Sequence, residues 1–236
     1  MNSNKKTARI AGVLYLLNGI TSGFAFAYVI AKVYVAGDAA LTAANVVANS
    51  GLVRIGVVAD LFQATVWVFL GMTLYLLLKH VNKSMAGTML VLVAVGAAIV
   101  CLNDVFQFAA VRVAIDASYA TAFGAAGSDA LVLLLLDIHH YGFLIAQIFF
   151  GLWLVPLGYL AYESGMFPKA LGVVLIVGGG CYLVGMLAVF LVPDFGEKIN
   201  VFVTIPSAIA EISMVLYLLV FGVRTVKPDA RVPADS

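Results

Sequence analysis

The stretch Met85–Val111 reads MAGTMLVLVAVGAAIVCLNDVFQFAAV, and it decides the class of fold. A bilayer core of roughly 30 Å needs about 20 consecutive helical residues that are mostly apolar. This stretch exceeds that length and contains a single charged residue, Asp104. Its length and apolar character predict a transmembrane helix rather than a core helix of a soluble domain.

The composition of the whole chain agrees with that of this stretch. Of its 236 residues, 64% are hydrophobic and 11% are charged, and the mean hydropathy is +1.09. A soluble domain is about 45–50% apolar and about 25% charged, so a soluble core would leave too much apolar surface in water. The net charge of +1 gives no basic field that attracts nucleic acid. These values exclude a soluble enzyme, a nucleic-acid binder and a disordered regulator, and they indicate membrane lipid as a partner.

Six apolar stretches of spanning length predict an all-α, polytopic integral membrane protein. We expect one bundle of six transmembrane helices over residues 1–226, with spans at 10–34, 55–78, 85–111, 137–162, 170–192 and 201–223. The fourth apolar stretch begins at Leu131 and is too long for one straight crossing, so its first part is expected to tilt, protrude or lie along a surface. Loops are expected at residues 36–54, 112–130 and 193–200, a short surface helix at 39–50, and a flexible tail at 227–236.

Basic residues are concentrated on one side of the predicted bundle. The connections on that side alternate with longer, acid-rich connections. Under the positive-inside rule the basic side faces the cytoplasm, so both termini are predicted to be cytoplasmic. The basic side holds nine of the 13 lysines and arginines, namely Lys5, Lys6, Arg9, Lys79, Lys83, Lys169, Arg224, Lys227 and Arg231.

Several polar side chains fall inside the predicted spans, where lipid would normally exclude them. Because such groups usually face a protein or water-filled interior, we interpret them as a polar cavity that opens outward and narrows toward Glu211. Asp60, Asp104 and His140 are expected at similar depth near its mouth, with Asp137 orienting the His140 imidazole. The other expected members, on the faces of the first, second and fourth spans, are Asn18, Thr21, Gln63 and Gln147.

The leading functional hypothesis is a protein that binds a small solute or a lipid-derived ligand. As a carrier, it would also transport this ligand. Glu211 would be the central group that responds to a proton or a cation, with Asn18 as a neighbour. Six spans suffice for a carrier, particularly as a homo-oligomer such as a dimer. The identity of the small molecule stays open at this point.

Two other hypotheses remain open. An imidazole and several carboxylates on facing helices are a typical set of zinc or iron ligands, which would make the protein an intramembrane, metal-dependent hydrolytic enzyme. Its candidate ligands are Asp60, Asp104, His140 and Glu211. Alternatively, the protein is a non-catalytic accessory subunit whose polar groups only join helices, with Arg54 or Arg112 paired to Asp60 or Asp104.

Four stretches carry a resemblance to a known family. The most specific is Gly158–Gly172, which fits the pattern Gly-Tyr-Leu-x-Tyr-x-Ser-Gly-x-x-Pro-(Lys/Arg)-x-Leu-Gly, and the others are Ala8–Tyr15, His140–Gly142 and Gly151–Tyr159. Together with Glu211 in the last span, they resemble a bacterial multi-pass membrane family known as domain of unknown function 4386. The resemblance covers nearly the whole chain. It implies a helical protein of the bacterial inner membrane and supplies no catalytic residues.

Overall fold

The structure is a computed structural model that describes residues 3–224 of the chain. Within that range the regular elements are all helices, and six of them are long and apolar enough to cross a membrane. The prediction of an all-α protein with six spans is therefore confirmed. The tail expected at residues 227–236 lies outside the described residues.

The first crossing, Ser3–Val33, is continuous but changes its winding along its length. It comprises α1 (Ser3–Ser22), a π-helical segment η1 (Gly23–Ile30) and the short α2 (Ala31–Val33). The short α3 covers Ala39–Ala48. The other five crossings are α4 (Ser50–Leu78), α5 (Lys83–Ile115), α6 (Ala117–Glu163), α7 (Lys169–Leu191) and α8 (Pro193–Val220).

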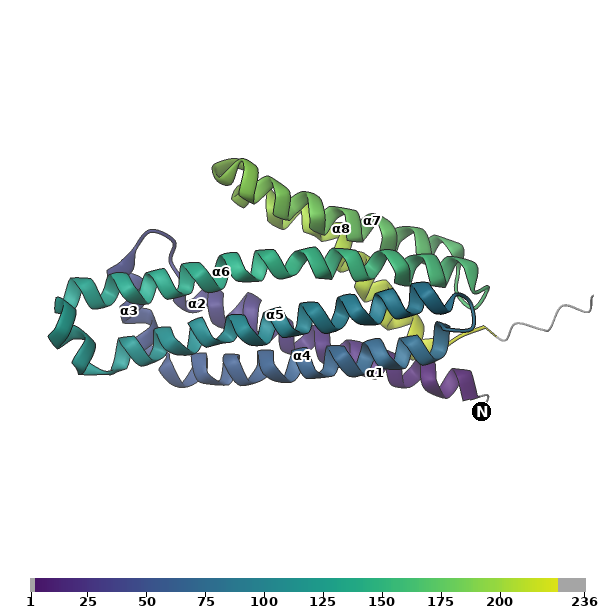
Figure 1. Ribbon diagram of the computed structural model, residues 1–236, viewed down its shortest axis with the longest axis horizontal. Coiled ribbons are helices and arrows are strands. Elements are labelled where there is room, and N and C mark those ends of the chain that lie inside the picture. The colour runs from purple at the N-terminus through teal and green to yellow at the C-terminus, as the bar shows by residue number, and fades with distance from the viewer. Residues whose placement is uncertain (1–2, 225–236) are drawn as a thin grey trace, which may run out of the picture.

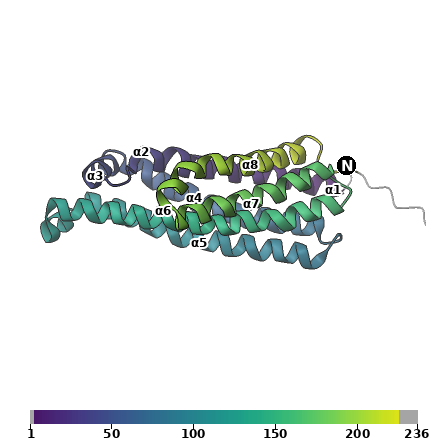
Figure 2. The same ribbon diagram turned by 90° about the horizontal axis from the view of Figure 1, so that it is seen from above.

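The helices form an elongated bundle, as Figures 1 and 2 show from two directions. The N-terminus and the α4–α5 and α6–α7 connections lie at one end, which we call the terminal end. Residues after α8 return there too, because the Arg224 backbone N–H donates to the Met166 carbonyl at 3.0 Å. The α5–α6 connection and α3 lie at the opposite end, which we call the far end. The α7–α8 connection stops short of the far end in both views.

The helices extend further than the sequence analysis predicted. The expected loop at 112–130 is helical apart from Asp116, which separates α5 from α6, and a break at Gly124, where φ is +74°. The segment after Asp116 is rich in alanine, which favours a helix, and Asp116 caps its start by accepting from the Ser118 N–H. The expected loop at 193–200 is the first part of α8, which begins with Pro193. With 33 residues, α5 is about 50 Å long at 1.5 Å per residue and is longer than a bilayer core of roughly 30 Å.

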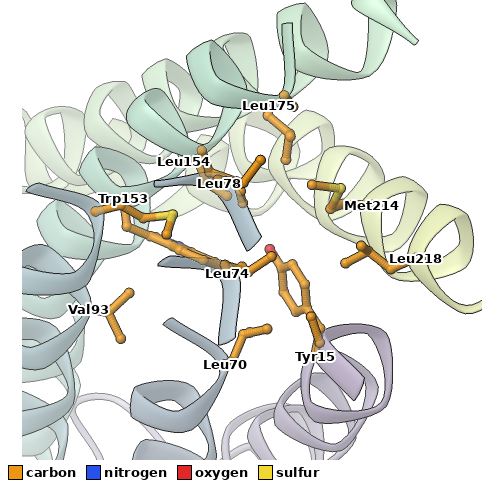
Figure 3. Packing of buried hydrophobic residues seen from close by; sticks show 14 of the residues in the cluster. Tyr15, Leu70, Leu74, Leu78, Val93, Trp153, Leu154, Leu175, Met214 and Leu218 are labelled. Atoms are coloured by element: carbon orange, nitrogen blue, oxygen red, sulfur yellow. The ribbon is translucent and has the colours of Figure 1, made fainter. Parts of the chain in front are cut away.

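Two apolar clusters, separated by a polar layer, form the interior. The first cluster lies toward the terminal end; Figure 3 shows Tyr15, Leu74 and Trp153 converging there, with the Tyr15 hydroxyl directed inward. The second lies toward the far end and includes Val53, Val111 and Leu136. On α4 and α5 the buried polar residues fall between the two clusters along the helix, and on α6 His139 does the same while Gln147 directly follows Ala146 of the first cluster. These residues are Asp60, Gln63, Asn103, Asp104, Gln107, His139 and Gln147.

Helices α6 and α7 pack backbone against backbone through two pairs of glycines. An added Cβ on Gly158 would lie 2.5 Å from the Gly172 carbonyl oxygen, and one on Gly179 would lie 2.6 Å from that of Gly151. Only glycine permits such an approach, and small residues at helix contacts are typical of membrane bundles. This packing fixes the position of α7 relative to the polar layer.

Candidate functional site

A cavity of about 460 Å³ lies in the middle of the bundle, next to the polar layer. Its walls come from α1 and η1, α4, α6, α7 and α8. A volume in this range is typical of small-molecule sites, which are apolar pockets with a few placed polar groups. The polar side chains of the wall are Asn18, Ser22, Gln63, Gln147, Tyr182, Thr204 and Glu211.

Glu211 is the acidic residue of the cavity wall, and two tyrosines hold its carboxyl group. The Tyr15 hydroxyl donates to Oε2 at 2.8 Å, and the Tyr182 hydroxyl donates to Oε1 at 3.0 Å. The three residues come from α1, α7 and α8, so the hydrogen bonds join the first crossing and the last two crossings at Glu211. Each carboxylate oxygen keeps further acceptor capacity, because an ionised carboxylate accepts at about four positions.

Two amides form a second polar part of the wall. Gln63 of α4 donates from Nε2 to Asn18 Oδ1 of α1 at 2.9 Å. Gln147 of α6 is 6% exposed, and its Oε1 has no hydrogen-bond partner among the described residues. A buried amide oxygen without a partner costs free energy, of the order of 1–3 kcal/mol. The Gln147 amide is therefore available to a ligand in the cavity.

Aromatic rings complete the wall. The Phe26 and Phe143 rings stack with centroids 3.9 Å apart, and Phe150 lies against both Phe143 and Tyr182. Trp67 and Trp153 pack edge to face at 5.8 Å, and both line the cavity. A carboxylate beside several aromatic faces is a typical environment for a bound ammonium group.

The cavity opens at the side of the bundle, between the first crossing and α8. Its lining residues Gly19, Gly23 and Ala27 on one side, and Ala208 and Ile212 on the other, are themselves exposed on the molecular surface. Closer to the terminal end the two helices touch, because an added Cβ on Gly12 would lie 3.0 Å from the Leu218 Cβ. The surface around the opening carries the exposed apolar side chains Ile20, Ile205 and Ile209, so in a membrane it faces lipid.

A second polar group lies in the same layer, where α4, α5 and α6 meet. Asp60, Asp104 and His139 each place one potential metal-ligating atom within 4.8 Å of the other two. His139 Nε2 is 3.8 Å from Asp104 Oδ1, and all three side chains are buried. Asp60 and Gln63 lie one turn apart on α4, so this group is next to the amide side of the cavity.

The placement of His140 differs from the sequence-based prediction. His140 Nε2 lies 2.9 Å from Glu197 Oε1 of α8, whereas His139, the preceding residue, joins the two aspartates. Asp137 does not orient His140 either: its Oδ1 accepts from the Tyr34 hydroxyl at 2.6 Å. Burial and this hydrogen bond raise the pKa of Tyr34 above its usual range. The tyrosine ring stacks on His140 at 5.6 Å.

The remaining predicted residues divide into those that line the cavity and those that do not. Asn18, Gln63, Gln147 and Glu211 line it. Thr21 does not, because its hydroxyl donates to the Leu17 carbonyl of its own helix at 2.8 Å. The accessory-subunit hypothesis expected Arg112 to pair with Asp60 or Asp104, but Arg112 pairs with Asp116 at 3.9 Å instead. Glu211 lies with two tyrosines and is not in the group of Asp60, Asp104 and His139.

The sequence analysis missed Tyr15 and Tyr182 as partners of Glu211. The available signal was their position: both tyrosines lie well inside a span, away from the interface where tyrosine is enriched. A tyrosine in that position needs a partner for its hydroxyl, and a carboxylate on a third helix provides it.

Comparison with known families gives one match. The family described as Domain of unknown function (DUF4386) matches residues 10–222, which include all six crossings in whole or in part. The chain therefore belongs to this family. No curated protein and no solved structure matches it.

Proposed function

We propose that this member of the DUF4386 family is a membrane receptor or carrier component that binds an amphiphile with a cationic head group. The head group would lie beside Glu211, and the apolar chain would leave the cavity between η1 and α8 into the lipid. The observation that carries the proposal is the position of the Glu211 carboxyl group, which is held by Tyr15 and Tyr182 in the wall of an aromatic cavity that opens sideways.

The charge of the wall favours a cation over an anion. No lysine or arginine is among the residues that line the cavity within the described range 3–224, and Glu211 is the only acid among them. An anionic head group would meet the Glu211 carboxylate without a compensating charge. A cation would instead gain from the carboxylate and from the faces of Trp67, Trp153 and Phe150.

The amides provide a second point of recognition. Gln147 Oε1 has no partner, and it accepts a hydrogen bond from a primary or secondary ammonium group or from a hydroxyl of the ligand. The aromatic and apolar remainder of the wall suits the hydrocarbon part of such a molecule. Transport of the bound ligand stays a prediction, because a carrier needs a path to both faces of the membrane and the lining residues indicate one opening, at the side of the bundle.

We also infer that the terminal end faces the cytoplasm, in the cytoplasmic membrane of a bacterium. The support is the distribution of positive charge. Seven of the basic residues predicted to be cytoplasmic lie within the described range, and each is at the start of α1, just after α8, or beside the α4–α5 or α6–α7 connection. These are Lys5, Lys6, Arg9, Lys79, Lys83, Lys169 and Arg224.

Tryptophan fluorescence tests the proposed function directly, because the chain has two tryptophans and both line the cavity. The full chain in lipid nanodiscs is titrated with a brominated alkyl trimethylammonium, and in parallel with a brominated alkyl sulfate of equal chain length. We expect saturable quenching by the ammonium compound, and weak, non-saturating quenching by the sulfate.

A matched pair of variants assigns the binding to the carboxylate. Glu211→Gln keeps the size of the side chain and is expected to weaken binding of the ammonium compound by at least about tenfold, which corresponds to about 1.4 kcal/mol. Glu163→Gln, an exposed acid at the terminal end, should bind like the wild type. Equal quenching by both compounds, or unchanged binding by Glu211→Gln, would overturn the proposal.

A further inference from the structure

Asp60, Asp104 and His139 form a compact group that no part of the proposed function uses. They come from three successive helices, α4, α5 and α6. Their side chains are almost completely buried, at 3%, 2% and 2% exposure. One carboxylate oxygen or imidazole nitrogen from each lies within 4.8 Å of the others. Three separate helices therefore bring two acids and an imidazole to one point inside the membrane-spanning bundle.

The group is not satisfied by the protein around it. Neither Asp104 Oδ1 nor Oδ2 has a hydrogen-bond partner within residues 3–224, and His139 Nδ1 has none. Gln107, one turn along α5 from Asp104 and 0% exposed, also has no partner for its Nε2 or its Oε1. No ion pair joins a lysine or arginine to Asp60 or Asp104 in the described part of the chain. Buried polar groups without partners are costly, and a bound cation that accepts lone pairs from the Asp104 carboxylate and from the imidazole would offset that cost.

We propose that Asp60, Asp104 and His139 bind a divalent first-row transition cation, with zinc as the ion to test first. Two carboxylates carry a formal charge of −2, which one divalent cation neutralises, so the occupied site would be neutral overall. The imidazole favours zinc, iron or copper, whereas magnesium and calcium prefer oxygen ligands alone. Three protein ligands also leave a coordination position for water or a small ligand.

The dimensions of the group fit such an ion after a small closure. Zinc lies about 2.0–2.2 Å from nitrogen and carboxylate oxygen, so the donor atoms of a tetrahedral site are roughly 3–3.5 Å apart. His139 Nε2 and Asp104 Oδ1 are already 3.8 Å apart. The side chains need to move by less than one bond length to close around the ion.

Asn103 positions His139 from the neighbouring helix. Its Nδ2 donates to the His139 backbone carbonyl at 2.8 Å in a buried hydrogen bond between α5 and α6. Its Oδ1 occupies the space in which a side chain at position 142 would lie, which Gly142 leaves free. These contacts hold α5 and α6 in register at the level of the proposed ligands, as supporting residues do around metal sites.

The experiment compares neighbouring histidines in the full chain, purified in detergent. The protein is stripped with a chelator, reloaded with zinc and desalted, and its metal content is measured by mass spectrometry. We expect about one zinc per chain for the wild type and for His140→Ala. His139→Ala and the nearly isosteric Asp104→Asn should each retain less than a tenth of that amount. Cobalt substitution should give the visible absorption bands of a tetrahedral site in the wild type and in His140→Ala, and should not give them in His139→Ala or Asp104→Asn.

A second measurement separates loss of metal from loss of fold. Zinc should raise the Tm of the wild type and of His140→Ala, because a ligand that binds only the folded state stabilises it. It should leave the Tm of Asp104→Asn unchanged, while circular dichroism shows the same helicity as the wild type. Absence of bound zinc, iron or manganese and of a zinc-dependent Tm in the wild type would overturn the proposal. Equal loss of metal in His140→Ala would overturn the assignment to His139.

The metal site does not rest on the proposed function. Quenching of tryptophan fluorescence by the brominated alkyl ammonium compound should be retained in Asp104→Asn, and zinc binding should be retained in Glu211→Gln. Failure of one proposal is therefore distinguishable from failure of the other.

Discussion

His139 and His140 are adjacent in the sequence, but their imidazoles belong to different parts of the molecule. His139 Nε2 lies 3.8 Å from Asp104 Oδ1 of α5, and His140 Nε2 lies 2.9 Å from Glu197 Oε1 of α8. The rotation of about 100° between successive residues of an α-helix accounts for the separation. One imidazole is buried in the polar layer, and the other joins α6 to the first part of α8.

The side opening of the cavity can be tested at Gly19. An added Cβ at this position meets no atom within 4 Å, and the residue lines the cavity where it reaches the surface. Gly19→Leu should therefore obstruct entry and weaken binding of the brominated ammonium compound at least about fivefold, or roughly 1 kcal/mol, with little change in Tm. The control is Gly51→Leu, at an open position at the start of α4. A Gly19→Leu protein that binds normally would contradict the opening.

The close packing of α6 on α7 predicts opposite effects at two neighbouring glycines. Gly179→Ala pushes a methyl group against the Gly151 carbonyl oxygen, whereas Gly180→Ala meets no atom within 4 Å. Overpacking costs about 1–3 kcal/mol, which corresponds to a Tm lower by roughly 3–10 °C. Gly180→Ala should leave the Tm unchanged or raise it slightly, because alanine favours the helix. Thermal unfolding in detergent measures both, and equal Tm values for the two variants would contradict the packing described.

The His140–Glu197 pair predicts control over access to the cavity. It is a side-chain contact between α6 and the first part of α8, and Thr204 lies two turns further along α8 in the cavity wall. Glu197→Gln should release this part of α8 and speed the maleimide labelling of a Thr204→Cys protein several-fold. Asp194→Asn, an exposed acid one turn earlier, is the matched control. Cys101 and Cys181 are first replaced by alanine, and unchanged labelling would mean that the pair does not hold α8.

The proposed orientation in the membrane predicts which end of the bundle is reached by a reagent that cannot cross the membrane. His80 lies in the α4–α5 connection of the terminal end, and Ala117 lies at the start of α6 at the far end; both are exposed. In intact bacterial cells lacking the two native cysteines, Ala117→Cys should react with an impermeant maleimide and His80→Cys should not. After the cells are broken, both should react. The reverse pattern in intact cells would place the termini outside.

The sequence allowed six membrane-spanning helices to be predicted, because their length and hydropathy can be read along the chain. The interpretation that Asp60, Asp104 and His140 form the mouth of the cavity was wrong, since none of the three lines it. The sequence also identified Asn18, Gln63, Gln147 and Glu211 as residues of a polar cavity, and all four line the cavity of the structure. It did not separate His139 from His140, since neighbouring polar residues at the same depth give no information on which one faces inward. The rotation of α6 about its own axis decides which histidine faces inward, and it depends on the packing of α6 against α5, where Asn103 donates to the His139 carbonyl.

The lengths of the helices were harder to predict than their positions. Hydropathy marks where a helix enters lipid, but α5 and α6 continue through segments of mixed polarity, where alanine content and the capping residue Asp116 determine the helical state. The partners of Glu211 were not predicted for another reason. Tyr15, Tyr182 and Glu211 lie on three different helices, so no local sequence pattern connects them.

The polar layer has a consequence for biosynthesis. Ribosomes deliver α4 to the membrane before α5 and α6, yet Asp60 of α4 meets its buried neighbours Asp104 and His139 on those later helices. An aspartate inside a membrane-spanning helix is costly until it faces a protein or water-filled interior. We therefore expect a nascent chain that ends after α4 to stay beside the insertion machinery until α5 and α6 are translated. Elongation speed through α5 and α6 then sets how long the unfinished protein is exposed to membrane proteases.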